Sequence, residues 1–263
     1  MFGQINNYEN KLFISGQEVL GVESVDVSYS NSSSISKLLG FEKGLTTVDN
    51  TSNQKVSISR NLIYEDPMMN YTGSNAIVGS INYNDNSYGF KSGYLDEYMV
   101  NCAVGSIPKV STNITVHDEL KSGINDASGS IAPPTIHVPN QGSISLSCDH
   151  SSTNRVVGFD YSLKVSRKPI YSIGSKRPTE IVLINPIEFS ASVQVDVDDA
   201  FLQSGMSFLE TRQNKTVVFT IKSNDNLLIL QQLSIPNASL VGESLSSSAD
   251  GGVKITLNYI GHL

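Results

Sequence analysis

Short runs in which apolar and polar residues alternate recur along the whole chain. They include residues 25–29, 56–59, 193–197 and 253–259. Because successive side chains of a β-strand point to opposite faces, each run predicts a strand with one buried and one polar face. Turn-forming segments such as 84–87 separate the runs, a pattern typical of antiparallel sheets with one solvated face. The sequence therefore predicts a mainly β fold.

The second half of the chain echoes short motifs of the first half in the same order. The matched segments are 56–64 with 163–171, 79–84 with 191–196, and 106–111 with 234–239. The offset between matched segments increases along the chain and never reverses, as expected for a tandem duplication with insertions. We therefore expect two related antiparallel β domains, and a duplicated domain suggests a protein that builds something by symmetry.

The echoes and the composition of the connecting segments give the expected boundaries. Residues 121–141 are small and polar and contain Ala132-Pro133-Pro134, which favours an extended linker. Residues 1–19 are expected to form an N-terminal arm or an extra edge strand. The first domain is then 20–120 and the second 142–263.

Two segments have no partner in the other half. Residues 198–211 carry acidic cap candidates and an apolar cluster, which predicts one short helix in the second domain. The segment 31–54 is too long for an ordinary hairpin loop. It is either a mobile loop or an arm that buries Leu38, Leu39 and Phe41 against a neighbouring subunit.

The charge balance and the chain start argue against several classes of protein. The net charge is −7, the pI is about 5.1, and no basic stripe of the kind that binds nucleic acid is visible. Residues 1–7 do not resemble a signal peptide, and no apolar run has the length of a membrane span. We expect a protein made in a cytoplasm-like compartment that stays there until lysis or assembly.

No catalytic or cofactor-binding motif is present, so we predict neither an enzyme nor a bound cofactor or metal. The four histidines are scattered, and no nucleophile elbow, phosphate loop or dinucleotide fingerprint occurs. Cys102 and Cys148 are too few for a disulfide scaffold, which favours free thiols. Arg60 and Arg167 follow a serine in matched segments, and we interpret them as candidate subunit-interface residues.

The order of these elements resembles the tail-tube and baseplate-hub superfamily of tailed bacteriophages. In each half a strand beginning near Val25 or Ile144 is followed by a strand reaching Ser-Arg, an Ile/Val-rich strand and a Ser-Ile-Pro segment. Residues 153–162 and 169–175 also have the general character of phage virion proteins. The first half departs from the pattern because it lacks the expected helix.

The resemblance implies β-sandwich or half-barrel domains, six of which close into a ring. A chain with two copies would build that ring as a pseudo-hexameric trimer, or as a hexamer, around a carboxylate-rich lumen through which DNA slides. The implied function is a structural protein of the virion tail, either the tail tube or a trimeric hub or adaptor that contacts other tail proteins.

A binding protein of the tail tip is the rival hypothesis. A receptor- or glycan-binding β-sandwich predicts exposed aromatic residues on loop tips. The candidates are Tyr29, Tyr64, Tyr71, Tyr83, Tyr88 and Tyr94. Several of these lie at strand positions, where packing in the core is the alternative.

Overall fold

In the part of the chain that it describes, the computed structural model has sixteen β-strands and the short 3-10 helix η2. The structure describes residues 10–36, 45–83, 86–118, 120–127, 135–139, 143–148, 156–175, 177–197, 215–248 and 252–263. The strands of the first half are β1 (Lys11–Ile14), β2 (Gln17–Val19), β3 (Val22–Ser36), β4 (Leu45–Asn61), β5 (Ile77–Tyr83), β6 (Asn86–Ala103), β7 (Lys109–Val116) and β8 (Leu120–Ser122), with the helix η2 (Pro67–Tyr71) between β4 and β5. Those of the second half are β9 (Ile144–Cys148), β10 (Val156–Lys164), β11 (Arg167–Ile170), β12 (Glu180–Leu183), β13 (Glu188–Asp196), β14 (Lys215–Lys222), β15 (Ile229–Ser248) and β16 (Gly252–His262).

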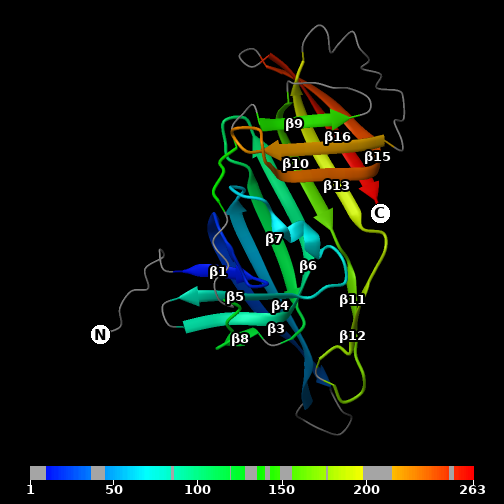
Figure 1. Ribbon diagram of the computed structural model, residues 1–263. Coiled ribbons are helices and arrows are strands. Elements are labelled where there is room, and N and C mark those ends of the chain that lie inside the picture. Colours follow the sequence, from blue (N-terminus) through cyan, green and yellow to red (C-terminus); the bar gives the residue numbers. More distant parts are fainter. Residues whose placement is uncertain are drawn as a thin grey trace.

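Fourteen of these strands form one continuous antiparallel sheet that is folded over on itself. Its long strands lie side by side in the order β3, β4, β7, β6, β10, β13, β16 and β15. Short strands run across this long layer at two places, with β1, β5 and β8 at one and β9 at the other (Figure 1). The fold confirms the mainly β prediction.

The long strands β6 and β15 connect the two layers. The first part of β6 pairs with β5, and its remainder from Gly93 pairs with β7. In the same way, the first part of β15 pairs with β14, and its remainder from Ser239 pairs with β16. Each long strand therefore turns the sheet from one layer into the other.

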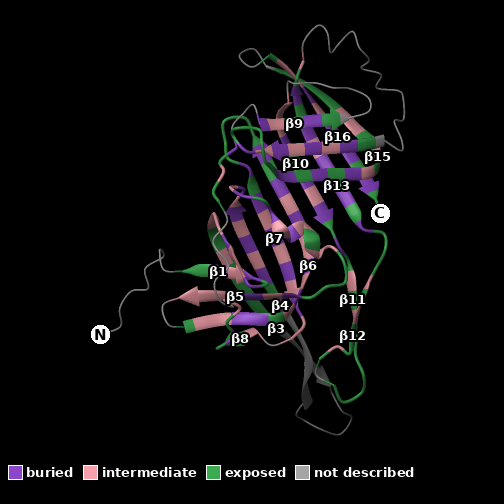
Figure 2. Ribbon diagram, viewed as in Figure 1, coloured by how far each residue is buried: buried purple, intermediate pink, exposed green. Residues whose placement is uncertain are grey.

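The core lies between the layers, and the alternation seen in the sequence places it there. Along β7 and β13 every second residue is buried, so the strands show alternating bands of buried and more exposed residues (Figure 2). Phe219 of β14 stacks on Phe159 of β10 with ring centroids 4.5 Å apart, and its ring is fully buried. The opposite face of the long layer carries the polar side chains.

The strand pairing of the first half recurs in the second half. Five ladders correspond in chain order: β1·β5 with β9·β14, β3·β4 with β10·β13, β4·β7 with β13·β16, β5·β6 with β14·β15, and β6·β7 with β15·β16. The β11–β12 hairpin lies in the chain between β10 and β13, the place that the far part of the β3·β4 ladder occupies in the first half.

Three interruptions of the ladders fall at matching positions. Glu23 of β3 and Val157 of β10 are each one extra residue at the start of their strands. Asp96 of β6 and Val241 of β15 are each one extra residue just after the bend. At the bend, the register of β5·β6 and the register of β14·β15 skip the same number of residues on each strand. Because a bulge breaks a ladder at one definite residue, these matches align the two halves residue by residue.

This alignment differs from the one that the sequence echoes suggested. Arg60 lies in β4 and corresponds to Val195 of β13, whereas Arg167 begins β11. The echoes at 79–84 and 191–196 lie in β5 and β13, which are not corresponding strands. The echoes are therefore wrong as an alignment, because short alternating segments of Ser, Ile and Val match one another in many registers.

The predicted N-terminal arm and long loop contain strands. Residues 11–19 form the β1–β2 hairpin at the edge of the sheet, and β1 pairs with β5. Most of the predicted loop 31–54 continues the β3·β4 ladder as far as the pair Ser36 and Leu45. The helix predicted at 198–211 lies outside the described residues.

The predicted linker makes contacts with the first half where it is described. Ile124 is buried, and the backbone amide of Asp126 donates to the Ser80 hydroxyl. In return the Asp126 carboxylate accepts a hydrogen bond from the amide of Gly16 at 2.8 Å. These residues therefore belong to the first half rather than to a free connection.

We expect Gly89→Ala to destabilise the fold by about 1–3 kcal/mol, because the site has no room for a methyl group. A Cβ at Gly89 would lie 2.5 Å from the carbonyl oxygen of Gly79 and 2.8 Å from that of Ile124. Gly73→Ala is the matched control, since a Cβ there meets nothing within 4 Å. Urea unfolding followed by circular dichroism measures both, and equal stabilities of the two variants would contradict the close approach.

Candidate functional site

The two halves are joined by an antiparallel ladder between β6 and β10. Seven residue pairs form it, from Glu97 opposite Lys164 to Ala103 opposite Gly158. Backbone bonds continue the contact at both ends, from Val165 to Asp96 and from Val104 to Val157, each at 2.8 Å. The long layer therefore passes from one half to the other without a break. We call this contact the internal junction.

The core side of the internal junction is closely packed. Tyr98, Val100 and Cys102 of β6 face the core, and so do their partners on β10, Leu163, Tyr161 and Phe159. All six side chains are at most 4% exposed. Burial raises the pKa of the free Cys102 thiol to about 11. The junction is thus built like the interior of a domain and not like a loose contact between domains.

The polar side of the internal junction carries matched partners. The Asn101 amide donates to the Asp160 carboxylate at 2.5 Å, and Lys164 lies 3.9 Å from Glu97. Arg167 of β11 adds a clamp at the end of the ladder. Its guanidinium donates to the carbonyl oxygens of Leu95, Tyr71, Thr72 and Gly73, all in the first half.

A buried charge pair supports the junction from the first half. The guanidinium of Arg60 pairs with the Asp66 carboxylate, and both side chains are at most 1% exposed. The hydroxyl of Tyr98, a residue of the internal junction, donates a hydrogen bond to the Asp66 carboxylate at 2.6 Å. Burial and the nearby Asp66 carboxylate hold the pKa of Tyr98 well above its usual range. Burial lowers the pKa of Arg60, but the Asp66 carboxylate together with Tyr64 and Tyr98 outweighs it, and the pKa rises.

The strands that correspond to β6 and β10 lie at the two ends of the long layer. By the alignment of the halves, β10 corresponds to β3 and β6 corresponds to β15. Within the described residues, β3 pairs only with β4, and the later part of β15 pairs only with β16. The counterparts of the two strands that form the internal junction therefore each lack a partner strand on one side. We call the two strand segments, residues 24–30 and 242–248, the free edges, because within the described residues the backbone of each has a partner strand on one side only.

Apolar side chains on the free edges are exposed where their counterparts are buried. Val27 is 37% and Tyr29 is 60% exposed, whereas the corresponding Tyr161 and Leu163 are at most 1% exposed. Leu245 is 52% exposed, whereas the corresponding Val100 is 1% exposed. Full burial of one such aliphatic side chain contributes roughly 1.5–3 kcal/mol. An unpaired strand edge with exposed apolar residues is a template for another strand.

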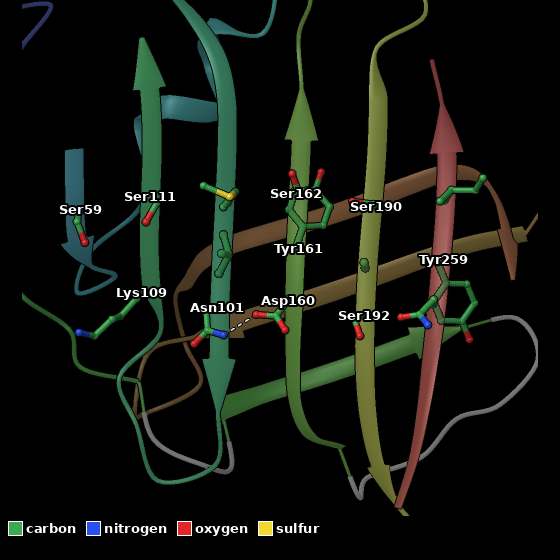
Figure 3. Close-up of a pocket in the computed structure, with 15 residues that line it drawn as sticks. Ser59, Asn101, Lys109, Ser111, Asp160, Tyr161, Ser162, Ser190, Ser192 and Tyr259 are labelled. Carbon is green, nitrogen blue, oxygen red and sulfur yellow. Dashed lines mark hydrogen bonds between the residues drawn. The ribbon is translucent and has the colours of Figure 1, made fainter. Parts of the chain in front are cut away.

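The polar face of the long layer carries a row of short hydroxyl side chains. The ladder registers place Ser24, Ser59, Ser111, Ser162, Ser190 and Ser239 in one row, together with Met99 and Ile260. Part of this row lines a shallow hollow of about 540 Å³ across β4, β7, β6, β10, β13 and β16. Figure 3 shows its serines on neighbouring strands, beside Lys109 and Asp160. Lys109 is also paired with Glu23 at 3.0 Å.

The residues predicted from the sequence as interface candidates are not brought together. Leu38, Leu39 and Phe41 lie outside the described residues. Arg60 is buried and forms an ion pair with Asp66 of the same chain. Arg167 does lie at an interface, but at the one between the two halves of the same chain.

The tyrosines proposed for ligand binding do not gather on loop tips. Tyr64 is buried, and Tyr71, Tyr83, Tyr88 and Tyr94 are half-buried. Tyr29 is exposed, but it lies on the free edge of β3.

The sequence contains a repeat that the echoes missed. The ladder alignment sets Lys109-Val-Ser-Thr-Asn-Ile-Thr-Val-His117 against Lys254-Ile-Thr-Leu-Asn-Tyr-Ile-Gly-His262, with identical Lys, Asn and His at three positions. It also sets Asp26 and Ser28 against Asp160 and Ser162. A search for spaced polar identities would have found both matches.

Comparisons and the remaining side chains add no other site. No protein-family model matches the chain. No curated protein matches it either. Among the described residues, no group of three or more His, Cys, Asp or Glu side chains is placed to hold a metal ion. In the part of the chain that the structure describes, no helix has the length and apolar character needed to cross a membrane.

We expect Asp66→Asn to lower the free energy of unfolding by about 3 kcal/mol, because it leaves the buried Arg60 charge without a counter-ion. Asn keeps the shape of the side chain and one oxygen, which can accept from the amide of Met68, while its amide nitrogen takes the position that accepts from the Tyr98 hydroxyl. The variant therefore removes the charge and one acceptor. Chemical denaturation measures the effect. Glu23→Gln, which breaks an exposed pair with Lys109, is the control and is expected to unfold like the parent protein.

Proposed function

We propose that the chain is a structural protein of a bacteriophage tail that assembles into a ring of three copies with six similar units. In this proposal the ring is a segment of the DNA-conducting tail tube. Each chain supplies two tandem tail-tube-like domains, and the protein acts by assembly and not by catalysis. Its place is the tail of the virion, assembled in the host cytoplasm, where it contacts other tail proteins.

The observation that carries the proposal is the internal junction together with the free edges. The chain already joins one unit to the next through β6·β10, and it leaves the same two edges open at its ends. Repeating one head-to-tail contact generates a closed ring if the rotation per unit divides the circle, and an open filament if it does not. Closure removes the exposed strand edges, which would otherwise promote aggregation.

The distribution of mass across the sheet favours the polar face for the lumen. The short strands and the core cover one face of the long layer, so the bulkier side fits the larger outer radius of a ring. The other face carries the row of serines described above. This serine-rich face is less acidic than the carboxylate-rich lining that the resemblance implies. Short hydroxyl groups bind water, and two lysines of this face lie beside carboxylates that offset their charge toward phosphate, Lys109 beside Glu23 and Lys164 beside Glu97.

The alternative within the same family is a trimeric hub or adaptor at the tail tip. Both proteins would be rings of this chain, but a tube ring stacks many times and a hub occurs once. Copy number per virion distinguishes them, and stacked rings in images of the purified protein would favour the tube. A receptor- or glycan-binding role is less well supported, because the candidate tyrosines are not clustered on loop tips.

The purified protein is expected to form rings with a mass of three chains. Light scattering after size-exclusion chromatography measures the mass, and negative-stain images show the shape. A protein that stays monomeric at all concentrations and gives no ring in virions would contradict the proposal.

Charge placed on either free edge is expected to abolish the rings. Val27→Asp and Leu245→Asp each put a carboxylate where the proposal buries an apolar side chain, while both positions are exposed in the single chain. The variants should therefore stay folded, as circular dichroism measures, and monomeric, as light scattering measures. Leu227→Asp is the matched control, because Leu227 is 87% exposed and lies in the turn between β14 and β15. Rings that persist in both edge variants would exclude these edges.

A further inference from the structure

We infer that β15 of one copy pairs with β3 of the next copy as an antiparallel ladder in a defined register, with Leu245 opposite Val27. The inference rests on the proposed ring and adds the strands, their direction and the residue pairs of the contact between copies. The occupant of each free edge is thus a second copy of this chain.

The register follows from the internal junction. In that junction Cys102 lies opposite Phe159, Val100 opposite Tyr161, and Tyr98 opposite Leu163. The bulges align β6 with β15 and β10 with β3 residue by residue. Carrying each pair across sets Ser247 opposite Val25, Leu245 opposite Val27, and Glu243 opposite Tyr29. A shift by one residue would turn the apolar side chains toward the polar face, so the register is strongly constrained.

The core sides of the two edges complement each other in this register. Val27 and Leu245 lie on the same side of the sheet as the buried Val56 and Ile255, to which their own strands are paired. When the edges pair, these two exposed side chains become neighbours over the core. Their contact takes the place of Val100 against Tyr161 in the internal junction.

The polar side is complementary as well. In the internal junction Asn101 donates to Asp160 across the ladder. The corresponding pair between copies is Ser246 with Asp26, a hydroxyl donor facing an exposed carboxylate acceptor. Both edges are therefore matched on each face, which a surface selected only for solubility would not need to be.

Glu243 gives an independent indication of a missing donor. One of its carboxylate oxygens is buried, and that oxygen has no hydrogen-bond partner in the structure. Buried acceptors in folded proteins nearly always have a partner. The inferred register brings the side chain of Tyr29, 60% exposed and carrying a phenol hydroxyl, opposite Glu243. The pair Glu243–Tyr29 between copies corresponds to the pair Tyr98–Leu163 in the internal junction. Each pair contains one tyrosine, but on the other strand of the ladder.

Disulfide trapping tests the register in the full-length protein. The double variant Val27→Cys/Leu245→Cys is expected to give covalent dimers and trimers under mild oxidation, because directly opposite residues in an antiparallel pair have the Cβ separation that a disulfide needs. Glu23→Cys/Leu245→Cys is the out-of-register control and should stay uncross-linked. The single variants should also stay uncross-linked, which excludes pairing of two β15 or two β3 edges.

The outcomes separate the register from the proposed function. Rings in the unmodified protein without cross-links in Val27→Cys/Leu245→Cys, or cross-links equally strong in the control, would overturn the inferred register and leave the ring intact. Absence of rings in the unmodified protein would remove the proposed function itself. As a second readout, Tyr29→Phe should weaken assembly several-fold while leaving the monomer's unfolding curve unchanged. An unchanged assembly would overturn the Tyr29–Glu243 pairing.

Discussion

The backbone ladder between β6 and β10 is the contact on which the rest of the structure depends. Every strand in a sheet presents hydrogen-bonding groups on both sides, and a strand at the end of a sheet leaves one set unpaired. The chain meets this need internally by pairing β6, at one end of the first half, with β10, which corresponds to the strand at the other end of that half. This pairing leaves β3 and the later part of β15 as the ends of a longer sheet. Their unpaired backbone groups then need partner strands from other copies of the chain.

The two halves share a pairing pattern but differ in how they are reinforced. The first half buries the Arg60–Asp66 pair and the hydroxyl of Tyr98, and the second half packs Phe219 against Phe159 and Tyr161. The internal junction is closed within the chain, and its core side is buried. The edges at the two ends must be stable in solution before they meet, and they carry two acidic residues, Asp26 and Glu243. These differences are consistent with one contact made on folding and another made on assembly.

The sequence predicted the strands well, because period-two alternation is a direct consequence of the pleat. The alternation at 25–29, 193–197 and 253–259 lies in β3, β13 and β16. The short apolar echoes in the sequence could not align the halves. The bulges at Asp96 and Val241 fix the register, and in the sequence only the spaced polar identities follow it. The alternation also could not show that Arg60 is buried beside Asp66, because a buried pair and a surface arginine have the same local sequence. The exposed residues of the free edges look in the sequence like any other strand residues.

Hydrogen exchange on the assembled protein tests the central claim most directly. In residues 24–30 and 242–248, the backbone amides that point away from β4 and β16 should exchange rapidly at concentrations where the protein is monomeric, whereas the others are bonded in the β3·β4 and β15·β16 ladders. In the ring the amides that point away should become as protected as residues 97–103 and 158–164 of the internal junction, because a continuous ladder then covers both edges. Rings whose amides in 24–30 and 242–248 exchange as fast as in the monomer would contradict the account.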